Sequence, residues 1–435
     1  MRYISIFFIA ITLSLTSCKK EEIKPVTNTT TTEERARDAF YDLMQSWYLW
    51  YKQIPSVTLA DYKDPVELLE AIRYKPVDRW SFVMDYNQYV SRMVQGIFVG
   101  HGISIGMDAS NNVRIVKLYK ESELYKKFGV RRGWILKKPN GSNLAEVILS
   151  GNSTLYNQLW GASEAGVVNT FIFQTPDGKD STIISTKSSL IVNTVMVSDT
   201  LHLRSGITGH LVYDQFIEPT AGELKAAFAF FKQNNIKDLI LDMRYNGGGF
   251  ENILQELASY VAGNKHVGTP IMKLKFNDKH PDQERNVPFT TTDYPLDLPR
   301  LIVISSRNTI SASEEVINGL RAIIPVTVIG DTTEGKPTGM ALYNDMWKKY
   351  VFAPVQFEAV NSKDEGGYYD GIPPAKYVPD DITHDFTDRK ELCLKEAIQF
   401  LETGSFSQKS TYLRQPVKII TEEPEWTRNL YIKGN

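Results

Sequence analysis

The pattern of apolar and polar positions changes character along the chain. Residues 34–94 carry apolar and aromatic side chains at helical spacing, as in ARDAFYDLMQSWYLWYKQIP, and a second helix is predicted to begin at Asp64-Pro65. Residues 97–188 contain short β-rich pieces, HGISIGM and VRIVKL, followed by a short helix over 121–129. We expect the aromatic side chains of the first region to lie in a core.

From about residue 207 the pattern alternates between apolar strands and amphipathic helices. The segments that we interpret as strands are GHLVYDQF at 209–216, LILDM at 239–243, LIVIS at 301–305 and VTVIG at 326–330. Continuous apolar strands separated by helices indicate a sheet that is covered on both faces. The stretch 277–299 is a polar, proline-containing insertion, and the polar stretch from about 405 is expected to pack loosely.

The N-terminus has the pattern of a targeting segment. Arg2 precedes an apolar run at 4–15 that is too short to span a bilayer. This run ends in LTSC, which resembles the lipobox of bacterial lipoproteins and implies cleavage before Cys18 and lipidation of its thiol. An ordinary signal peptide with a chance cysteine is the alternative. We therefore predict a lipoprotein signal peptide over 1–17 and a flexible tether over 18–33.

The residues after Cys18 bear on location. Lys19 follows the cysteine, where an aspartate would be the usual signal for retention in the inner membrane, so an outer-membrane lipoprotein in the cell envelope is expected. The Lys-Glu-Glu run resembles a surface-export signal, although a plain solvated linker would look the same. A body facing the periplasm and a surface-exposed body both remain open.

Composition excludes several classes of function. The chain has 435 residues, 49 basic and 51 acidic, and no basic block is large enough to follow the phosphates of a nucleic acid. The 42% hydrophobic content is typical of a globular protein, and the length permits two or three domains. Cys18 and Cys393 are the only cysteines, so acylation of Cys18 leaves no intrachain disulfide. No cofactor is indicated, and no metal site is expected at His101, which has no second histidine nearby.

The segment NTISASEEVINGL at 308–320 has two interpretations. Ser311 and Glu314 fit a capping box, and Pro325 ends the helix that follows, so a helix cap alone would explain the local pattern. Two other segments, LDMRYNGGG at 241–249 and IGDTTEGKPTGM at 329–340, also lie where a strand meets a loop, which is where α/β sheets build sites. Together the three segments favour a site that contains Ser311.

These segments, in this order and spacing, resemble the tail-specific, or carboxyl-terminal processing, serine peptidases of family S41. The order of elements in 95–190 resembles a PDZ domain, and the aromatic region resembles the helical domain of the family's bacterial lipoproteins. The resemblance implies a multidomain α+β protein with a crotonase-like α/β catalytic core. Its expected parts are a helical domain at 34–94, a PDZ-like domain at 95–190, a catalytic domain at 191–405 and a tail at 406–435.

The resemblance also assigns the reacting groups. It implies that Ser311 attacks the substrate and that Lys336, 25 positions later, is the base. A Ser-Lys pair requires a neutral amine, so burial must lower the pKa of the lysine from about 10.4. No histidine lies in 281–383, so these loops offer no Ser-His pair. Carboxylates of Asp331 and Glu334 would oppose the shift, and we predict that they point away.

Backbone groups are expected to complete the site. The N–H of Ala312, at the helix start, and that of Gly247 or Gly248 are the candidate oxyanion donors. Asp242 and Arg244 are interpreted as structural residues that fix the turn through buried hydrogen bonds. In the helix itself, Ser313 is interpreted as an ordinary helix residue and Glu314 as a cap partner.

The PDZ resemblance predicts a second site, for peptide ends. The loop before the first strand would bind a C-terminal carboxylate through its backbone N–H groups, and the strand edge would accept the peptide as an added strand. A generic small β-domain is the alternative. The expected partners are protein or peptide substrates with free C-termini, and the candidate loop residues are Gly100, His101, Gly102 and Ile103.

One residue departs from the family pattern. Many members place a glutamine four residues after the lysine, where this chain has Met340. Either the dyad suffices, another polar group substitutes, or activity is weakened. The main hypothesis is a lipid-anchored serine endopeptidase, and the alternative is a catalytically silent peptide-binding scaffold. A non-proteolytic hydrolase or small-ligand carrier on a crotonase-like core is a third possibility, against which the PDZ-like region argues.

Overall fold

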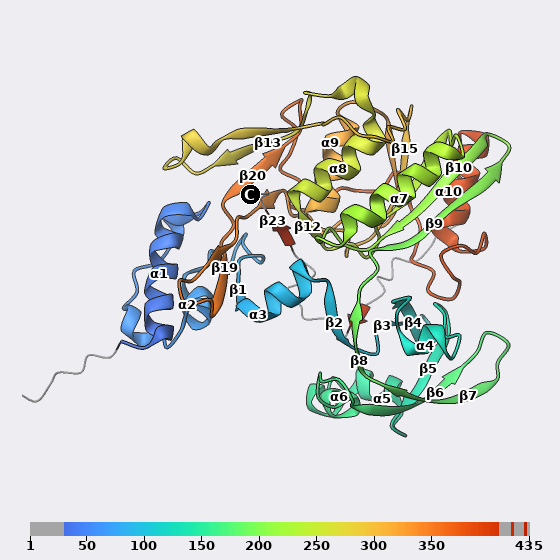
Figure 1. Ribbon diagram of the computed structural model, residues 1–435, viewed down its shortest axis with the longest axis horizontal. Coiled ribbons are helices and arrows are strands. Elements are labelled where there is room, and N and C mark those ends of the chain that lie inside the picture. Colours follow the sequence, from blue (N-terminus) through green and yellow to red (C-terminus); the bar gives the residue numbers. More distant parts are fainter. Residues whose placement is uncertain (1–29, 409–418, 422–429, 433–435) are drawn as a thin grey trace, which may run out of the picture.

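The computed structural model describes residues 30–408, 419–421 and 430–432 (Figure 1). The predicted signal peptide and Cys18 lie outside the described residues. Within the described ranges no helix is long and apolar enough to cross a bilayer.

The N-terminal region is helical, as predicted, but one of its strands joins a later part of the chain. Helix α1 (Thr32–Trp47) packs on α2 (Pro65–Ile72), whose first turn is capped by Asp64, the predicted start. Strand β1 (Phe82–Asp85) pairs antiparallel with β19 (Tyr350–Ala353), so the region is fastened to a segment more than 260 positions later in the chain. The short elements are η1 (Tyr51–Gln53), η2 (Leu59–Asp61), α3 (Tyr86–Tyr89) and the π-turn η3 (Val90–Val94).

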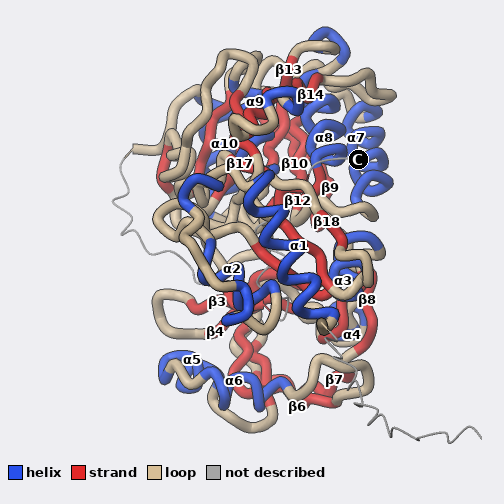
Figure 2. Tube along the Cα trace, turned by 90° about the vertical axis from the view of Figure 1, so that its left-hand side faces the viewer, coloured by secondary structure: helices blue, strands red, loops and turns tan. Residues whose placement is uncertain are grey.

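A six-stranded antiparallel sheet forms the second region, in the order β22-β3-β4-β5-β6-β7. Two connecting strands, β2 (Ile97–Gly100) and β8 (Ser188–Ile191), pair with each other where the chain enters and leaves. Figures 1 and 2 both place this region at one end of the molecule. Its elements are β3 (Ile103–Met107), β4 (Val113–Leu118), α4 (Glu123–Lys126), β5 (Ile135–Pro139), α5 (Leu144–Ser150), α6 (Ser153–Trp160), β6 (Val168–Gln174) and β7 (Asp180–Thr186).

The third region is built on a six-stranded sheet in the order β21-β16-β15-β11-β10-β9, parallel except for β9. Strands predicted as LIVIS and VTVIG have the predicted bounds. The strands are β9 (Val195–Leu203), β10 (Gly206–Tyr213), β11 (Asp238–Asp242), β15 (Leu301–Ser305), β16 (Val326–Gly330) and β21 (Lys376–Tyr377). The helices are α7 (Thr220–Gln233), α8 (Glu251–Ala262), α9 (Ala312–Arg321) and α10 (Leu392–Thr403).

Helices cover both faces of this sheet, as the apolar strands predicted. Leu239 and Leu241 of β11 belong to the core that contains the apolar side chains of α7, α8 and α9. Ile240, between them, faces the opposite way and belongs to a separate core with Leu394 and Leu401 of α10. The period of two along β11 therefore separates two apolar layers.

A smaller sheet lies beside the main one, in the order β14-β13-β20-β17. It includes part of the polar insertion, because β14 pairs antiparallel with β13. Its strands are β13 (Pro270–Phe276), β14 (Arg285–Pro288), β17 (Thr338–Gly339) and β20 (Phe357–Val360), and the neighbouring short elements are η4 (Asn264–His266), η5 (Pro281–Gln283) and β18 (Tyr343–Asn344).

Two described segments of the C-terminal stretch are strands that pair with other parts of the fold, so the expectation of loose packing is wrong for those segments. Strand β22 (Ile419–Thr421) pairs antiparallel with β3. Strand β23 (Leu430–Ile432) pairs parallel with β12 (Gly248–Phe250), beside which Figure 1 draws it. Backbone N–H and C=O groups on the edges of β3 and β12 can bond any extended chain, whatever its side chains, so a polar sequence did not reveal this pairing.

Candidate active site

Ser311 occupies the junction between the loop after β15 and helix α9. Its backbone has φ 62° and ψ −118°, a left-handed conformation that costs a non-glycine residue about 1–3 kcal/mol and is concentrated at functional sites. The side chain is fully buried, and its hydroxyl has no hydrogen-bond partner among the described residues. The capping box with Glu314 that the sequence predicts is present, but a helix cap does not require this left-handed backbone, so capping alone does not account for Ser311.

The glycine-rich turn after β11 is fastened to the loop that carries Ser311. Thr309 Oγ1 donates to the Met243 carbonyl at 2.8 Å. The Asn246 carbonyl accepts from Ile310 N at 3.0 Å and from Ser313 Oγ at 3.0 Å. Ser313 is thus a helix residue, as predicted, and it also holds the turn against the start of α9.

The glycines of this turn are required by the backbone. Gly248 has φ +94° and Gly249 has φ +145°, and a Cβ on Gly249 would lie 1.9 Å from the Phe216 carbonyl oxygen. Gly248 N donates to Asn246 Oδ1 at 2.9 Å, which uses that N–H inside the turn. Of the two candidate glycine donors, Gly247 is therefore the better placed to bond a ligand.

Glu314 links the nucleophile loop to the lysine loop. Its carboxylate accepts from Ser311 N at 2.8 Å, from Thr333 Oγ1 at 2.5 Å, from Gly335 N at 2.7 Å and from Lys336 N at 2.9 Å. Burial raises the pKa of Glu314 to about 6, against the lowering effect of these hydrogen bonds. The predicted cap partner is therefore also the connection that brings residues 311 and 336 into one site.

Lys336 is fully buried at this connection. Burial lowers the pKa of Lys336 to about 7, while the negative charges of Asp78 and Glu314 act to raise it. The predicted opponent Glu334 does point away, because its carboxylate forms an ion pair with Arg79 at 2.7 Å. The carboxylates that oppose the lowering of the Lys336 pKa are thus Asp78 and Glu314, not the pair predicted from the sequence.

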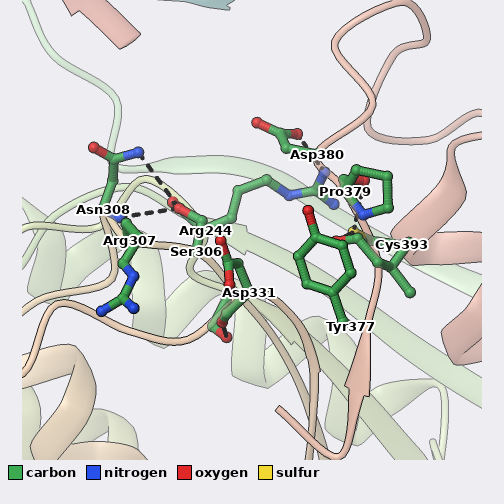
Figure 3. A pocket seen from close by; sticks show the side chains of 11 residues that line it. Arg244, Ser306, Arg307, Asn308, Asp331, Tyr377, Pro379, Asp380 and Cys393 are labelled. Atoms are coloured by element: carbon green, nitrogen blue, oxygen red, sulfur yellow. Dashed lines mark hydrogen bonds and ion pairs between the residues drawn. The ribbon is translucent and has the colours of Figure 1, made fainter. Parts of the chain in front are cut away.

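Arg244 anchors the turn from behind, in the structural role predicted for it. Its guanidinium donates to both oxygens of Asp242, at 2.7 Å for the shortest contact, and forms ion pairs with Glu391 at 2.7 Å and Asp380 at 2.9 Å. Figure 3 shows the side chain extending toward Asp380 across a small pocket of about 30 Å³ that Asp331 also lines. The charges in this pocket are therefore used to hold the strand end.

The antiparallel region contributes to the same anchor. Arg132, in the loop before β5, forms an ion pair with Asp380 at 3.0 Å and donates to Tyr245 Oη at 2.8 Å. Tyr245 Oη in turn donates to Asp380. The turn that carries the candidate oxyanion glycines thus touches residues of both regions.

The imidazole of His101, in the candidate peptide-binding loop, faces inward. It bonds Asn169 Oδ1 at 2.7 Å and Ser185 Oγ at 3.1 Å, and burial lowers the pKa of His101 to about 4. The imidazole is thus used inside the fold, and the peptide-binding role predicted for this loop concerns its backbone N–H groups. Gly102 has φ +73°, and its carbonyl accepts from Tyr119 N at 2.9 Å, so the loop has a fixed shape.

Two features of the site were missed or left open. Asp78, buried in the turn after α2, has the largest effect among the charges that act on Lys336, and no local pattern in the sequence indicates it. Met340 is fully buried in the apolar cluster with Tyr48 and Trp80, so no polar group stands at that position. Within the described ranges no group of three His, Cys, Asp or Glu side chains is placed to hold a metal ion.

Comparison with known proteins agrees with the arrangement. Residues 207–354 match the model of peptidase family S41, and residues 35–82 match that of the peptidase S41 N-terminal domain. The carboxy-terminal processing protease CtpB of Bacillus subtilis is 24% identical over 264 residues, which cover 60% of this chain and 52% of the relative. The chain thus spans about half the length of the curated relative that it matches.

Similarity also extends to solved structures. One from Bacteroides fragilis, described as an S41 protease, superposes with a TM-score of 0.70 at 18% identity and covers 84% of this chain and 97% of its own. The photosystem II D1 C-terminal processing protease covers 84% of this chain and 97% of its own, at 18% identity and a TM-score of 0.48. In its N-terminal and peptidase regions the chain is thus similar to the peptidases of family S41, and it shares the fold of a solved member.

Proposed function

We propose that the protein is a serine endopeptidase that uses Ser311 as nucleophile and Lys336 as general base. One observation carries this proposal: a buried lysine whose pKa is lowered to about 7 shares the carboxylate of Glu314 with a serine whose hydroxyl is buried and unbonded. A base that is half neutral near pH 7 is close to the optimum for proton transfer. No other serine of the SASE motif combines these properties, since Ser313 Oγ is bonded to Asn246.

The chemistry follows from these roles. Neutral Lys336 takes the proton of Ser311 Oγ as the oxygen attacks the scissile carbonyl carbon, and the carbonyl oxygen becomes an oxyanion. Ala312 N–H and Gly247 N–H are the proposed donors to it. The Lys336 ammonium then gives its proton to the leaving amine, and water hydrolyses the acyl-enzyme with the same lysine as base.

We propose that substrates are captured by their C-termini on the antiparallel region, which we assign as PDZ-like. The edge of β3 supports this, because it already accepts the extended segment β22 as an antiparallel strand. Added-strand binding of this kind gives affinity through main-chain hydrogen bonds. Backbone N–H groups of Gly100, Gly102 and Ile103 are the proposed carboxylate contacts. Amidation of a substrate's C-terminus should then weaken capture, and equal affinity for both forms would remove this role.

A catalytically silent scaffold is the second candidate, and Met340 favours it. Labelling with a fluorophosphonate probe, which reacts only with an activated serine, distinguishes the peptidase from the silent scaffold. The proposal predicts an adduct on wild type that is lost in Ser311→Ala and kept in Ser313→Ala, the matched control two positions away. Absence of an adduct on folded wild type would establish the scaffold instead.

The location proposal is an outer-membrane lipoprotein anchored through Cys18. Its support is the LTSC motif and the absence of aspartate after Cys18. Stable anchoring needs two signals, which dual acylation supplies. Cys18→Ala should therefore release the protein from the membrane fraction, and unchanged membrane association would refute the anchor. Protease shaving of intact cells would separate a periplasmic body, which is protected, from a surface-exposed one.

A further inference from the structure

A turn of the N-terminal region, residues 78–81, packs directly on the loop that carries Lys336. Arg79 donates to the Glu334 carboxylate at 2.7 Å and to the Glu334 carbonyl at 3.2 Å. Trp80 stacks on Tyr369 with ring centroids 6.3 Å apart. On the other side of the turn, Ser81 Oγ accepts from Val355 N at 2.9 Å. Arg79 therefore holds the turn against the lysine loop, whereas Trp80 and Ser81 fasten it to residues 369 and 355 of later segments.

Asp78, the first residue of this turn, is a buried carboxylate without an ion-pair partner in the described part of the chain. It is 1% exposed. Its Oδ1 accepts from Trp80 N and Ser81 N, both at 2.9 Å, and its Oδ2 accepts from Tyr48 Oη at 2.7 Å. These neutral donors fix the carboxylate but supply no positive charge. A buried charge is costly unless it is paired, so a fixed acid of this kind needs a reason.

Lys336 supplies the reason, because it is the neighbouring group that becomes positive during the reaction. Two carboxylates act on it, Asp78 from the turn after α2 and Glu314 from α9. Glu314 is occupied by four donors around the lysine loop, three of them backbone N–H groups. Of the two acids in the lysine loop, Glu334 forms an ion pair with Arg79, and Asp331 accepts a hydrogen bond from Thr332 N within the loop. Asp78 is thus the acid near Lys336 that no ion pair or loop contact accounts for.

We propose that Asp78 is a positioning residue of the catalytic site, whose fixed negative charge stabilises the ammonium that Lys336 becomes on taking the Ser311 proton. It does the work of the amide that the family pattern places at position 340, where this chain has Met340. The inference rests on the proposed Ser311–Lys336 dyad. It makes the N-terminal region part of the catalytic machinery, not only a neighbour of it.

The role has a signature that a structural role lacks. Removing the charge makes the ammonium less stable, so the pKa of Lys336 falls further below its usual value. In Asp78→Asn the acidic limb of the pH–rate profile should therefore move to lower pH, by about one unit. The rate on the plateau should fall about tenfold, because a weaker base transfers the proton less readily. Simple loss of packing would lower the rate without moving the limb.

The test measures the rate at which the whole protein is labelled by a fluorophosphonate at Ser311, across pH, so that no substrate is needed. Tyr48→Phe is the matched control, since it removes the hydrogen bond to Asp78 Oδ2 and keeps the charge. It should leave the limb in place. Asp78→Glu also keeps the negative charge, and it provides a test even if Asp78→Asn does not fold. The acidic limb of the Asp78→Glu profile should remain at the wild-type position.

The outcomes separate the two proposals. If wild type is labelled and the acidic limb of its pH–rate profile stays in place in Asp78→Asn, the role of Asp78 is overturned and the dyad is not. A limb that moves equally in Tyr48→Phe or in Asp78→Glu does the same, because the charge is then not the cause. Folded wild type that is not labelled at any pH overturns the dyad and this inference together.

Discussion

In the proposed dyad, burial is what makes Lys336 a usable base at neutral pH. An exposed lysine titrates near 10.4 and would be almost wholly protonated, whereas burial lowers the pKa of Lys336 to about 7. The sequence predicted this requirement but not how it is met. Motif and spacing could identify Ser311 and Lys336, but neither the left-handed backbone of Ser311 nor the action of Asp78 can be read from a local pattern, because both depend on contacts between distant segments.

The pKa gives a prediction for the pH–rate profile. Lys336 acts in its neutral form, so peptide cleavage should rise with pH through about 7 and level off above it. Below that value the rate should fall about tenfold per pH unit, since a single group must lose a proton. The measurement is kcat/KM against pH on one peptide. A profile that is flat from pH 5 to 8 would contradict a lysine base with this pKa.

At the scale of elements, apolar patterning predicted those strands and helices whose formation depends on residues close together in the sequence. The strands after 301 and 326 have their predicted bounds, and the capped helix follows Ser311. The pairing of β1 with β19, and of β22 and β23 with β3 and β12, was not predicted. Such short strands carry little periodicity, and their partners lie far away in the sequence.

The ion network behind β11 gives the element-scale prediction. Arg244 is 1% exposed, so its replacement leaves Asp242 and Glu391 as buried acids without their partner. Arg244→Met should lower the free energy of unfolding by about 3–5 kcal/mol, measured by urea denaturation. The control is Lys225→Met, which removes an exposed, solvent-screened ion pair with Asp293 and should change the free energy of unfolding far less. Equal effects would mean that the network does not hold the strand end.

At the scale of the whole molecule, the described C-terminal strands occupy two edges that a substrate would use. Strand β22 pairs with β3, the proposed edge for peptide capture, and β23 lies between β12 and β17, next to the oxyanion turn and the lysine loop. An incoming peptide that binds as an added strand must displace them. If the proposed capture on β3 holds, these strands of the chain compete with substrates for backbone hydrogen bonds.

This competition predicts the effect of removing the C-terminal stretch. A chain that ends after Gln408 should cleave a peptide with a KM several-fold lower than that of the full chain, and kcat should change little. Ile420→Pro is the point-variant counterpart, because proline cannot donate to the ladder with β3. It should lower KM in the same direction, by a smaller factor. An unchanged or higher KM in both variants would show that these strands do not compete with substrate.

The dyad is tested most directly by the turnover of Lys336→Arg beside that of Lys336→Ala. A guanidinium stays protonated in proteins, so arginine keeps the positive charge and much of the length but cannot accept the Ser311 proton. Both variants should fold and bind peptide as wild type does, and both should lose about 10³-fold or more of kcat. Turnover of Lys336→Arg near the wild-type rate would contradict the assignment of Lys336 as the general base.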